Sequence, residues 1–279
     1  MAVVLITGCS SGFGLLSALH FARKGDRVFA SMRDPAKGAA LEEAARKENL
    51  AIEVIQLDVK DEQSVAAAVR QVIDGAGRID VLVNNAGIGH HGPLEETDDD
   101  ELREIFETNF FGTMRAIRHV VPKMREQRSG TIVNVSSLAG RVPSPFQGVY
   151  SASKFALEAA SESLYFELHP FGVRVLLIEP GGFETNIENS RRHPRRFTEG
   201  SPYLDLDRRF SEALTRLPAA GARGDPQEVA ELIYTAVHDA EPKLRYLAGQ
   251  DAEMVAGLKK QLDDAQFEQA MRQALDFWD

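Results

Sequence analysis

Short apolar runs rich in β-branched residues alternate with helical stretches as far as residue 178. Six such runs are present: Val3 to Thr7, Arg27 to Ser31, Ile52 to Leu57, Val81 to Asn84, Thr131 to Ser136 and Arg174 to Ile178. Apolar residues recur at helical spacing between them, over Leu15 to Arg23, Lys37 to Lys47, Gln63 to Ile73, Glu101 to Met124 and Ser153 to Leu168. Strands separated by helices predict a parallel sheet covered on both faces. We therefore expect a doubly wound α/β fold of Rossmann type, with ligands at the carboxyl ends of its strands.

The pattern changes after this region. Residues 186–225 contain scattered Pro, Gly and Arg, with only a weak helical period around Leu204 to Leu217, and we interpret them as a substrate lid. Asp225 followed by Pro226 predicts the start of a helix through about Val237. Tyr246 to Ala248 can add an edge strand, and residues 251–279 should form a helical tail. A chain of 279 residues suits one large α/β domain that includes all these parts, 1–279.

Charge and composition restrict the partners. The net charge of −10 would repel nucleic acid, so we interpret the basic run Arg191 to Arg196 as solvated surface. No apolar run approaches the roughly 18 residues of a membrane span, and the lone Cys9 cannot form an intramolecular bridge. We expect a cytoplasmic protein with no nucleic-acid partner and no membrane span. We expect no metal either, because the adjacent His90 and His91 point to different sides of the backbone.

A glycine-rich turn lies between the first predicted strand and the helix after it. Glycines allow the backbone to approach a pyrophosphate closely, and the helix N-terminus supplies free N–H donors and a partial positive charge. The strict G-x-G-x-x-G spacing is absent, and a tight turn without any ligand is the alternative interpretation. The predicted dinucleotide-binding residues here are Gly8, Ser10, Ser11, Gly12, Phe13 and Gly14.

Two further blocks predict chemistry near this turn. Asn85-Ala86-Gly87 ends the fourth strand beside the first, where small residues admit a flat cofactor. Tyr150 and Lys154 are four residues apart on a predicted helix, so both side chains project from one face. A nearby cation should lower the pKa of the phenol, which makes Tyr a usable acid or base near neutral pH. Ser137 ends the fifth strand, where its hydroxyl can donate to a substrate oxygen.

Taken together, these motifs resemble those of the short-chain dehydrogenase/reductase family over nearly the whole chain. The matching segments, in order, are Thr7 to Gly14, Asp58, Asn84 to Gly87, Asn109, Ser137, Tyr150, Lys154 and Pro180 to Thr185. Ile6 to Gly14 and Tyr150 to Glu158 are most similar to the branch that contains 17-beta-hydroxysteroid and retinol dehydrogenases.

The resemblance implies a catalytic set. In it, Tyr150 exchanges a proton with the substrate oxygen, Ser137 hydrogen-bonds that oxygen, Lys154 holds the nicotinamide ribose, and Asn109 anchors a water in a proton relay. Without the resemblance, a helix break or a bond to backbone would explain Asn109 as well. The cofactor-binding residues implied in addition are Asp58, Val59, Pro180, Gly181, Phe183 and Thr185. It also implies a homodimer or homotetramer, formed through the helices that contain Glu101 to Met124 and Ser153 to Leu168.

Charge at the end of the second strand predicts which cofactor binds. NAD sites usually place an acid there for the ribose 2′-hydroxyl, whereas this chain has Met32 followed by Arg33. Arg33 would meet a 2′-phosphate, and Ser11 could add a donor, so we predict NADP(H) over NAD(H). The alternative is that Asp34 turns in toward a 2′-hydroxyl while Arg33 points to solvent.

The sequence thus predicts an NADP(H)-dependent oxidoreductase that interconverts a ketone or aldehyde with an alcohol. The expected substrate is medium-sized and apolar, such as a steroid, retinoid, lipid or polyketide-like molecule. Its pocket should include Leu138, Val142, Phe146 and Phe183. The alternatives are a sensor or scaffold that binds NADP(H) without turnover, and a family member acting as dehydratase or epimerase. Phe277 and Trp278 could dock on their own domain or on a neighbouring subunit.

Overall fold

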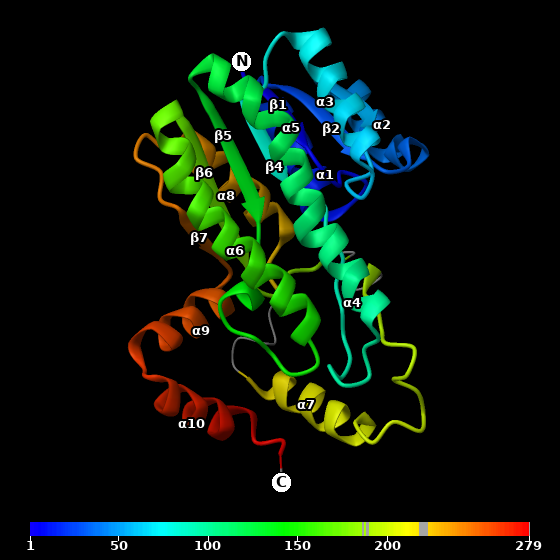
Figure 1. The fold of residues 1–279 in the computed structure, drawn as a ribbon, viewed down its shortest axis with the longest axis vertical. Coiled ribbons are helices and arrows are strands. Elements are labelled where there is room, and N and C mark those ends of the chain that lie inside the picture. The colour runs from blue at the N-terminus through cyan, green and yellow to red at the C-terminus, as the bar shows by residue number, and fades with distance from the viewer. Residues whose placement is uncertain (186, 188–189, 218–222, 279) are drawn as a thin grey trace.

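A seven-stranded parallel sheet forms the centre of the computed structural model, which describes residues 1–185, 187, 190–217 and 223–278 (Figure 1). Its strand order is β3-β2-β1-β4-β5-β6-β7. The strands are β1 (Val3–Ile6), β2 (Arg27–Met32), β3 (Ile52–Gln56), β4 (Val81–Asn84), β5 (Gly130–Val135), β6 (Val173–Pro180) and β7 (Arg245–Ala248). All six predicted strands are present, and the edge strand near Tyr246 pairs in parallel with β6. The predicted Rossmann-type fold is confirmed.

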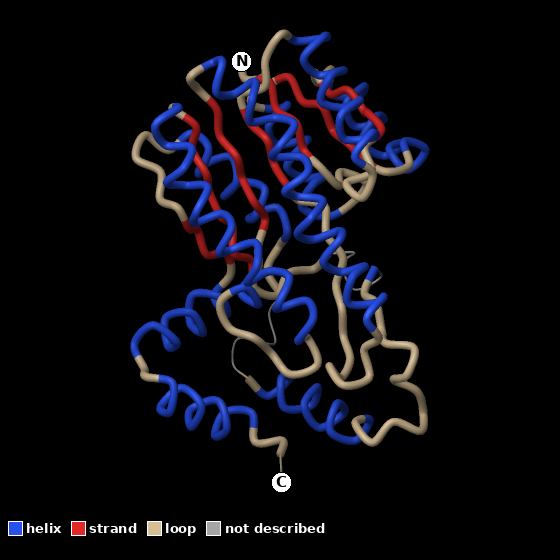
Figure 2. The backbone as a smooth tube through the Cα atoms, viewed as in Figure 1, coloured by secondary structure: helices blue, strands red, loops and turns tan. Residues whose placement is uncertain are grey.

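The sheet is apolar on both faces because helices cover both (Figure 2). Alternate β1 residues enter separate cores: Val4 and Ile6 pack with Phe21 on one face, whereas Val3 and Leu5 lie in the cluster on the other. The helices are α1 (Gly12–Arg23), α2 (Ala39–Glu48), α3 (Glu62–Ala76), α4 (Asp99–Phe106), α5 (Gly112–Gln127), α6 (Gly148–Leu168), α7 (Leu204–Arg216), α8 (Pro226–His238), α9 (Gln250–Gln261) and α10 (Asp264–Leu275). This two-sided burial explains why the strands read as continuous apolar runs.

The helix predicted over Glu101 to Met124 is not continuous. A π-helical segment, η2 (Glu107–Phe111), separates α4 from α5. Asn109 lies in this widened turn and uses its side-chain amide to hold the backbone of Ile88, on the loop after β4. One inserted residue of this kind is typical of functional sites in helices.

Helices α7, α9 and α10 lie beyond the carboxyl ends of the strands, and we call these three helices the cap (Figure 1). A small apolar cluster of Phe146, Phe210, Ala213, Leu275 and Phe277 holds α7 and α10 together. Phe277 is 3% exposed, so it docks on its own chain. The predicted helical tail consists of two helices, α9 and α10.

The break between α9 and α10 has a local cause. Asp263 caps α10 in a capping box with Gln266, which ends the preceding helix at that point. Within the predicted lid, residues 186, 188–189 and 218–222 lie outside the described residues. In the part of the chain that the structure describes, no helix is both long enough and apolar enough to cross a bilayer.

Candidate active site

The glycine-rich turn is closed by hydrogen bonds from the end of β4. The Asn85 side-chain amide donates to the carbonyls of Thr7 and Gly8, at 2.9 and 3.1 Å. Gly8 has a φ of +74°, which favours glycine. A Cβ on Gly14 would lie 2.4 Å from the Gly8 carbonyl oxygen, so a larger residue there would force the turn open. The turn therefore needs glycine at both positions.

The N-terminus of α1 suits an anionic ligand. Its N-cap residue, Ser11, makes no side-chain hydrogen bond to the first turn, and that turn contains no acidic residue. By contrast, Asp61 at the N-cap of α3 accepts from the amides of Gln63 and Ser64. The first amides of α1 are thus left for an external acceptor, with the positive end of the helix dipole behind them. These features fit the pyrophosphate of a dinucleotide.

The predicted segment Pro180 to Thr185 lies against this turn. The rings of Phe13 and Phe183 pack edge to face, with centroids 5.6 Å apart. A Cβ on Gly12 would be 3.6 Å from Cβ of Thr185. The structure therefore brings Phe183 to the glycine turn, on the expected cofactor side.

At the far side of the turn, β2 and β3 end together, since Met32 pairs with Gln56 in the sheet register. Arg33 follows β2 and is exposed. The Asp34 carboxylate accepts from the amide of Ala36 at 3.1 Å, which caps the short 3-10 helix η1 (Pro35–Gly38). The Asp34 carboxylate is thus hydrogen-bonded to the backbone of the turn that follows it.

Asp58 and Val59 follow β3 at the same edge of the sheet. The Asp58 carboxylate accepts from the amide of Lys60 at 3.0 Å, and the backbone N–H of Asp58 donates to Ser64 Oγ at 2.9 Å. Val59 is buried against Gly112, where a Cβ would come within 2.8 Å of the valine Cβ. Both residues lie at the carboxyl edge that carries the glycine turn.

Ser137, Tyr150 and Lys154 come together where β5 meets α6. Ser137 follows β5 and caps the short helix η3 (Leu138–Gly140), with its Oγ accepting from the amide of Ala139 at 3.1 Å. The Ser137 hydroxyl donates to the Pro180 carbonyl at 3.5 Å and lies close enough to Tyr150 to lower the pKa of its phenol. Lys154 Nζ lies 5.7 Å from the centroid of the Tyr150 ring and donates to the carbonyl of Val135 at 2.8 Å.

The electrostatics of this trio differ from the prediction. Burial raises the pKa of Tyr150, and Ser137 and the charge of Arg191 lower it only in part. The prediction of a lowered pKa for this phenol is wrong, because the effect of burial outweighs that of the neighbouring groups. Burial in turn lowers the pKa of Lys154 to about 8, against an opposing effect of Glu158.

Asn109 and Gly87 lie beside Ser137, Tyr150 and Lys154, and we call these five residues the corner. The Asn109 amide nitrogen donates to the Ile88 carbonyl and to Ser153 Oγ, at 3.0 and 3.1 Å. A Cβ on Gly87 would lie 3.4 Å from Asn109 Oδ1 and 3.9 Å from Lys154 Nζ. Glycine at this position therefore leaves open the space between the amide and the ammonium.

Phe146 connects this corner to the cap. It has a φ of +62°, which is strained for an aromatic residue, and its ring packs on His91 and Phe210, each at 5.8 Å between centroids. An apolar groove of about 410 Å³ lies beside it, lined by Pro93, Leu94, Glu95, Pro145, Phe146, Tyr203, Leu206, Phe277 and Trp278. Of the four predicted pocket residues, only Phe146 lines this groove; Leu138 and Val142 lie on the chain between Ser137 and Phe146.

His91 has a role in this region that the sequence did not predict. Its Nε2 is 2.8 Å from the Asp207 carboxylate of α7, so it joins the loop after β4 to the cap. The only signal in the sequence was its place just after the Asn-Asn-Ala-Gly block. The described residues hold no group of three or more His, Cys, Asp or Glu side chains placed to bind a metal.

The basic run before the cap is exposed, as the sequence predicted, and it also forms ion pairs. Arg195 pairs with Asp100 at 2.8 Å and with Asp98 at 3.4 Å, both at the N-terminus of α4. Arg192 pairs with Glu104 one turn further on. The acidic helix start that the sequence assigned to the helix dipole thus also binds this run.

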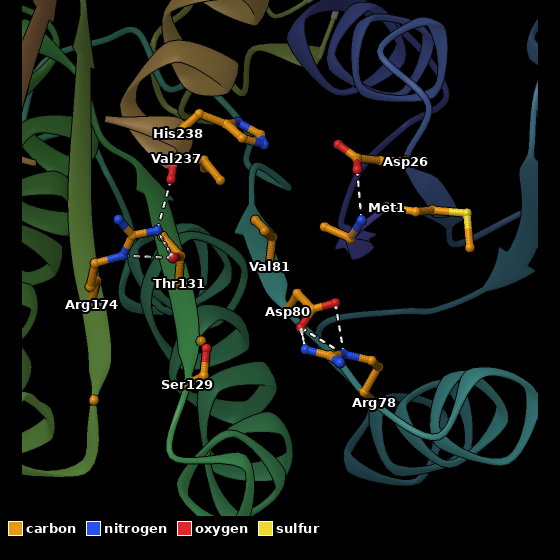
Figure 3. A pocket seen from close by; sticks show the side chains of 13 residues that line it. Met1, Asp26, Arg78, Asp80, Val81, Ser129, Thr131, Arg174, Val237 and His238 are labelled. Carbon is orange, nitrogen blue, oxygen red and sulfur yellow. Dashed lines mark hydrogen bonds and ion pairs between the residues drawn. The ribbon is translucent and has the colours of Figure 1, made fainter. Parts of the chain in front are cut away.

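A second cavity, of about 450 Å³, lies at the opposite end of the sheet (Figure 3). Several of its charged groups already have protein partners: Arg174 donates to Thr131 and to the Val237 carbonyl, Arg78 pairs with Asp80, and one Asp26 oxygen accepts from the amide of Ala2. Doubly wound sheets bind their ligands at the carboxyl ends of the strands. We therefore assign the candidate active site to the glycine-turn end.

Comparison with known proteins agrees with this geometry. Residues 2–196 match the family model described as short chain dehydrogenase. The chain is 35% identical to 3-ketodihydrosphingosine reductase of Bacteroides thetaiotaomicron, covering 97% of this chain and 96% of the relative. It is 39% identical to 17-beta-hydroxysteroid dehydrogenase type 1 of Homo sapiens, covering 94% and 81%. The crystal structure of a short-chain dehydrogenase from Streptomyces avermitilis superposes with a TM-score of 0.82 at 35% identity, covering 99% and 98%.

Other solved structures with this fold were determined in complex with NAD or with NADP. The resemblance to the branch of 17-beta-hydroxysteroid and retinol dehydrogenases is confirmed. With its parallel sheet, its glycine turn and its Ser137, Tyr150 and Lys154 at one corner, the chain belongs to the short-chain dehydrogenase/reductase family of oxidoreductases.

Proposed function

We propose that this protein is an NADP(H)-dependent oxidoreductase that interconverts a ketone or aldehyde with an alcohol on a medium-sized apolar substrate. One observation carries the proposal: Ser137 and a buried Lys154 both lie beside Tyr150, at the strand ends that also hold the glycine turn. A phenol, a hydroxyl donor and an ammonium at one point suit proton transfer to a carbonyl oxygen.

The role of each group follows from its chemistry. A bound nicotinamide dinucleotide would supply or accept the hydride. In the reducing direction, Tyr150 gives its phenolic proton to the carbonyl oxygen while the Ser137 hydroxyl holds that oxygen in place. Lys154, held beside the Tyr150 ring by its bond to the Val135 carbonyl, binds the nicotinamide ribose. Asn109, bonded to the Ile88 backbone, holds a water for the return of the proton.

NADP(H) is preferred in this proposal because of the charges after β2. Arg33 is exposed at the strand end, where a 2′-phosphate would meet its guanidinium. The alternative, in which Asp34 binds a 2′-hydroxyl, would require its carboxylate to leave the Ala36 amide. Ser11 makes no capping bond, so its hydroxyl is available as a further donor.

The apolar groove beside Phe146 supports an apolar substrate. It lies close to the reacting corner, since a Cβ on Gly148, two residues before Tyr150, would be 3.4 Å from a methyl of Leu94 in the groove wall. The relatives are named for a ketodihydrosphingosine and a hydroxysteroid. Leu138, Val142 and Phe183 complete the pocket in this proposal, beneath a lid of residues 186–225 and a tail of residues 251–279 in the same domain.

We also propose a cytoplasmic homo-oligomer, a dimer or tetramer, assembled through the helices η2, α5 and α6. Three phenylalanines are exposed there: Phe111 by 47%, Phe155 by 42% and Phe166 by 67%. Phe155 and Phe166 are about three helical turns apart and so share one face of α6, and exposed apolar side chains on one face are typical of a subunit contact. The buried, unpaired Cys9 suits a reducing compartment.

The test is a screen of carbonyl and alcohol substrates with NADPH and NADP⁺, on the wild type and on Tyr150→Phe. Because general acid catalysis contributes about 10²–10⁴-fold, Tyr150→Phe should lower kcat by that order. Tyr165→Phe, on the same helix but outside the corner, is the matched control and should turn over like the wild type. Equal rates for Tyr150→Phe and the wild type would refute the proposed mechanism.

A further inference from the structure

The face of α6 that carries Tyr150 and Lys154 continues with a third titratable residue. Glu158 lies four residues after Lys154, one helical turn further along, so the two side chains are neighbours on the helix surface. Each of these two residues is only 5% exposed. A lysine and a glutamate are thus buried one helical turn apart; Lys154 Nζ donates to the Val135 carbonyl, and Glu158 Oε1 is buried without a hydrogen-bond partner.

Beyond Glu158 the charges alternate in sign across three elements. Glu158 accepts from Arg245 of β7 at 3.0 Å, and Arg245 lies 3.3 Å from Glu179 of β6. Glu179 has a fully buried side chain and also pairs with Arg141, after η3, at 3.1 Å. Glu158, Arg245, Glu179 and Arg141 therefore form one connected series of ion pairs, with Arg141 at its solvent end and Lys154 one helical turn before Glu158.

The packing leaves no room for this series to rearrange. A Cβ on Gly140 of η3 would lie 2.8 Å from Ser136 Oγ, 3.1 Å from Glu158 Cγ and 3.3 Å from the Lys154 carbonyl carbon. Glycine at this position lets η3 close directly over the Lys154–Glu158 pair. The charged and titratable groups packed around the pair are Tyr150 and Glu162 of α6, Glu179 of β6, Arg245 of β7 and Arg141.

Buried charges perturb one another strongly in such a place. Burial lowers the pKa of Lys154, and the Glu158 carboxylate opposes that shift. Burial also raises the pKa of Glu158, and the Glu179 carboxylate adds to the rise. An isolated buried ammonium would release its proton, so a counter-charge is required for Lys154 to stay cationic at neutral and mildly alkaline pH.

We propose that Glu158 is a positioning residue that keeps Lys154 protonated and held for its cofactor, and that Arg245, Glu179 and Arg141 hold Glu158 in place. Only the expected effect of Glu158 on turnover rests on the proposed function. The electrostatic coupling of the two side chains is a property of the protein itself.

Lysine labelled with ¹³C at Cε reports the coupling by NMR without any cofactor or substrate. The Lys154 signal is assigned by its loss in Lys154→Met. In Glu158→Gln the midpoint of Lys154 deprotonation should fall by about one pH unit, because the opposing carboxylate is gone. Equal midpoints in Glu158→Gln and the wild type would overturn the inference.

Glu162→Gln is the matched control. Glu162 pairs with the same arginine, Arg245, at 2.8 Å but is half exposed, so its loss should leave the Lys154 midpoint within a few tenths of a pH unit. An equal shift in both variants would also overturn the inference, since the effect would then belong to Arg245. In Glu158→Asp, which keeps the charge, the midpoint should return most of the way to the wild-type value.

The wild type alone gives a further test if Glu158→Gln does not fold. Coupled groups titrate in more than one step, so the wild-type Lys154 signal should show a second, lower inflection from Glu158. A single inflection would refute the coupling. In turnover assays of Glu158→Gln, the pH at which kcat/KM for NADPH falls on the alkaline side should decrease together with the NMR midpoint. A shifted midpoint without any turnover would uphold the Glu158 inference while refuting the proposed function.

Discussion

The sheet and the cap are held together by different physical means. In the sheet, strands such as β1 and β4 are buried along their whole length, and both faces pack on helices. In the described residues, the cap is held by the small aromatic cluster around Phe210 and by polar contacts such as the His91–Asp207 pair and the bond from the Gly182 amide to Asp251. The region expected to bind the dinucleotide thus has a large buried core, whereas the region expected to meet the substrate has a small one.

This difference suits the two tasks. A cofactor shared across a family demands a fixed turn and fixed helix amides, whereas a substrate has to enter and leave. Regions with little buried apolar area open at low free-energy cost, and active-site lids are drawn from them. Changes in the sheet should therefore affect the whole fold, and changes in the cap should first affect substrate binding.

The largest effect in the cap is expected from Phe210→Ala. Phe210 is 1% exposed and contacts both Phe146 and Phe277, so its loss should cost about 3–5 kcal/mol within the cap. Hydrogen exchange should show faster opening of α7 and α10 with unchanged protection of β1 and β4, and KM for the substrate should rise. Phe166→Ala, at an exposed site, is the control. Equal loss of protection in the strands would show that sheet and cap unfold together.

The next largest effect is expected from two glycine-to-alanine substitutions, one that should destabilise the protein and one that should stabilise it. Gly14→Ala places a methyl 2.4 Å from the Gly8 carbonyl oxygen, and such overpacking should cost about 1–3 kcal/mol and weaken NADPH binding. Gly257→Ala, in α9, meets nothing within 4 Å and should stabilise the helix by about 0.5–1 kcal/mol. Thermal unfolding and an NADPH fluorescence titration measure both. Tight NADPH binding by Gly14→Ala would contradict the assignment of the turn.

A smaller effect is expected from Arg33→Ala. Losing a charged bond to the 2′-phosphate should weaken NADPH binding by about tenfold, or about 1.4 kcal/mol, and leave NADH binding unchanged. Lys37→Ala, another exposed cation nearby, serves as the control in the same titration. Tighter binding of NADH than NADPH by the wild type would refute the NADP(H) preference.

The smallest effect should come from Arg195→Ala. Its ion pairs with the start of α4 are exposed, and such pairs are screened by salt. The melting temperature should fall slightly at low ionic strength and not at all in 1 M NaCl. A large decrease that persists in high salt would show that these pairs, and not the aromatic cluster, hold the cap.

The same division explains what the sequence could predict. The strands, the glycine turn and the spacing of Tyr150 and Lys154 depend on local periodicity, and the structure has them where the sequence placed them. The π-helical turn at Asn109 depends on a contact with Ile88, and the pairing of Arg195 with Asp100 joins residues far apart in the chain. Such contacts leave no periodic signal in the sequence.

The pKa of Tyr150 shows the same limit. Helical spacing correctly put Lys154 beside it, but spacing carries no information on burial, which dominates the shift. Nor could the sequence show that Glu158 and Glu179 meet at Arg245, because β6, β7 and α6 come together only in the fold.

A crystal structure with bound NADP⁺ tests the central claim most directly. The account predicts the pyrophosphate on the first amides of α1, the nicotinamide ring facing the Tyr150 hydroxyl, and Lys154 Nζ within hydrogen-bonding distance of the nicotinamide ribose. A dinucleotide bound elsewhere, or a ring that lies away from Tyr150 and Lys154, would contradict it.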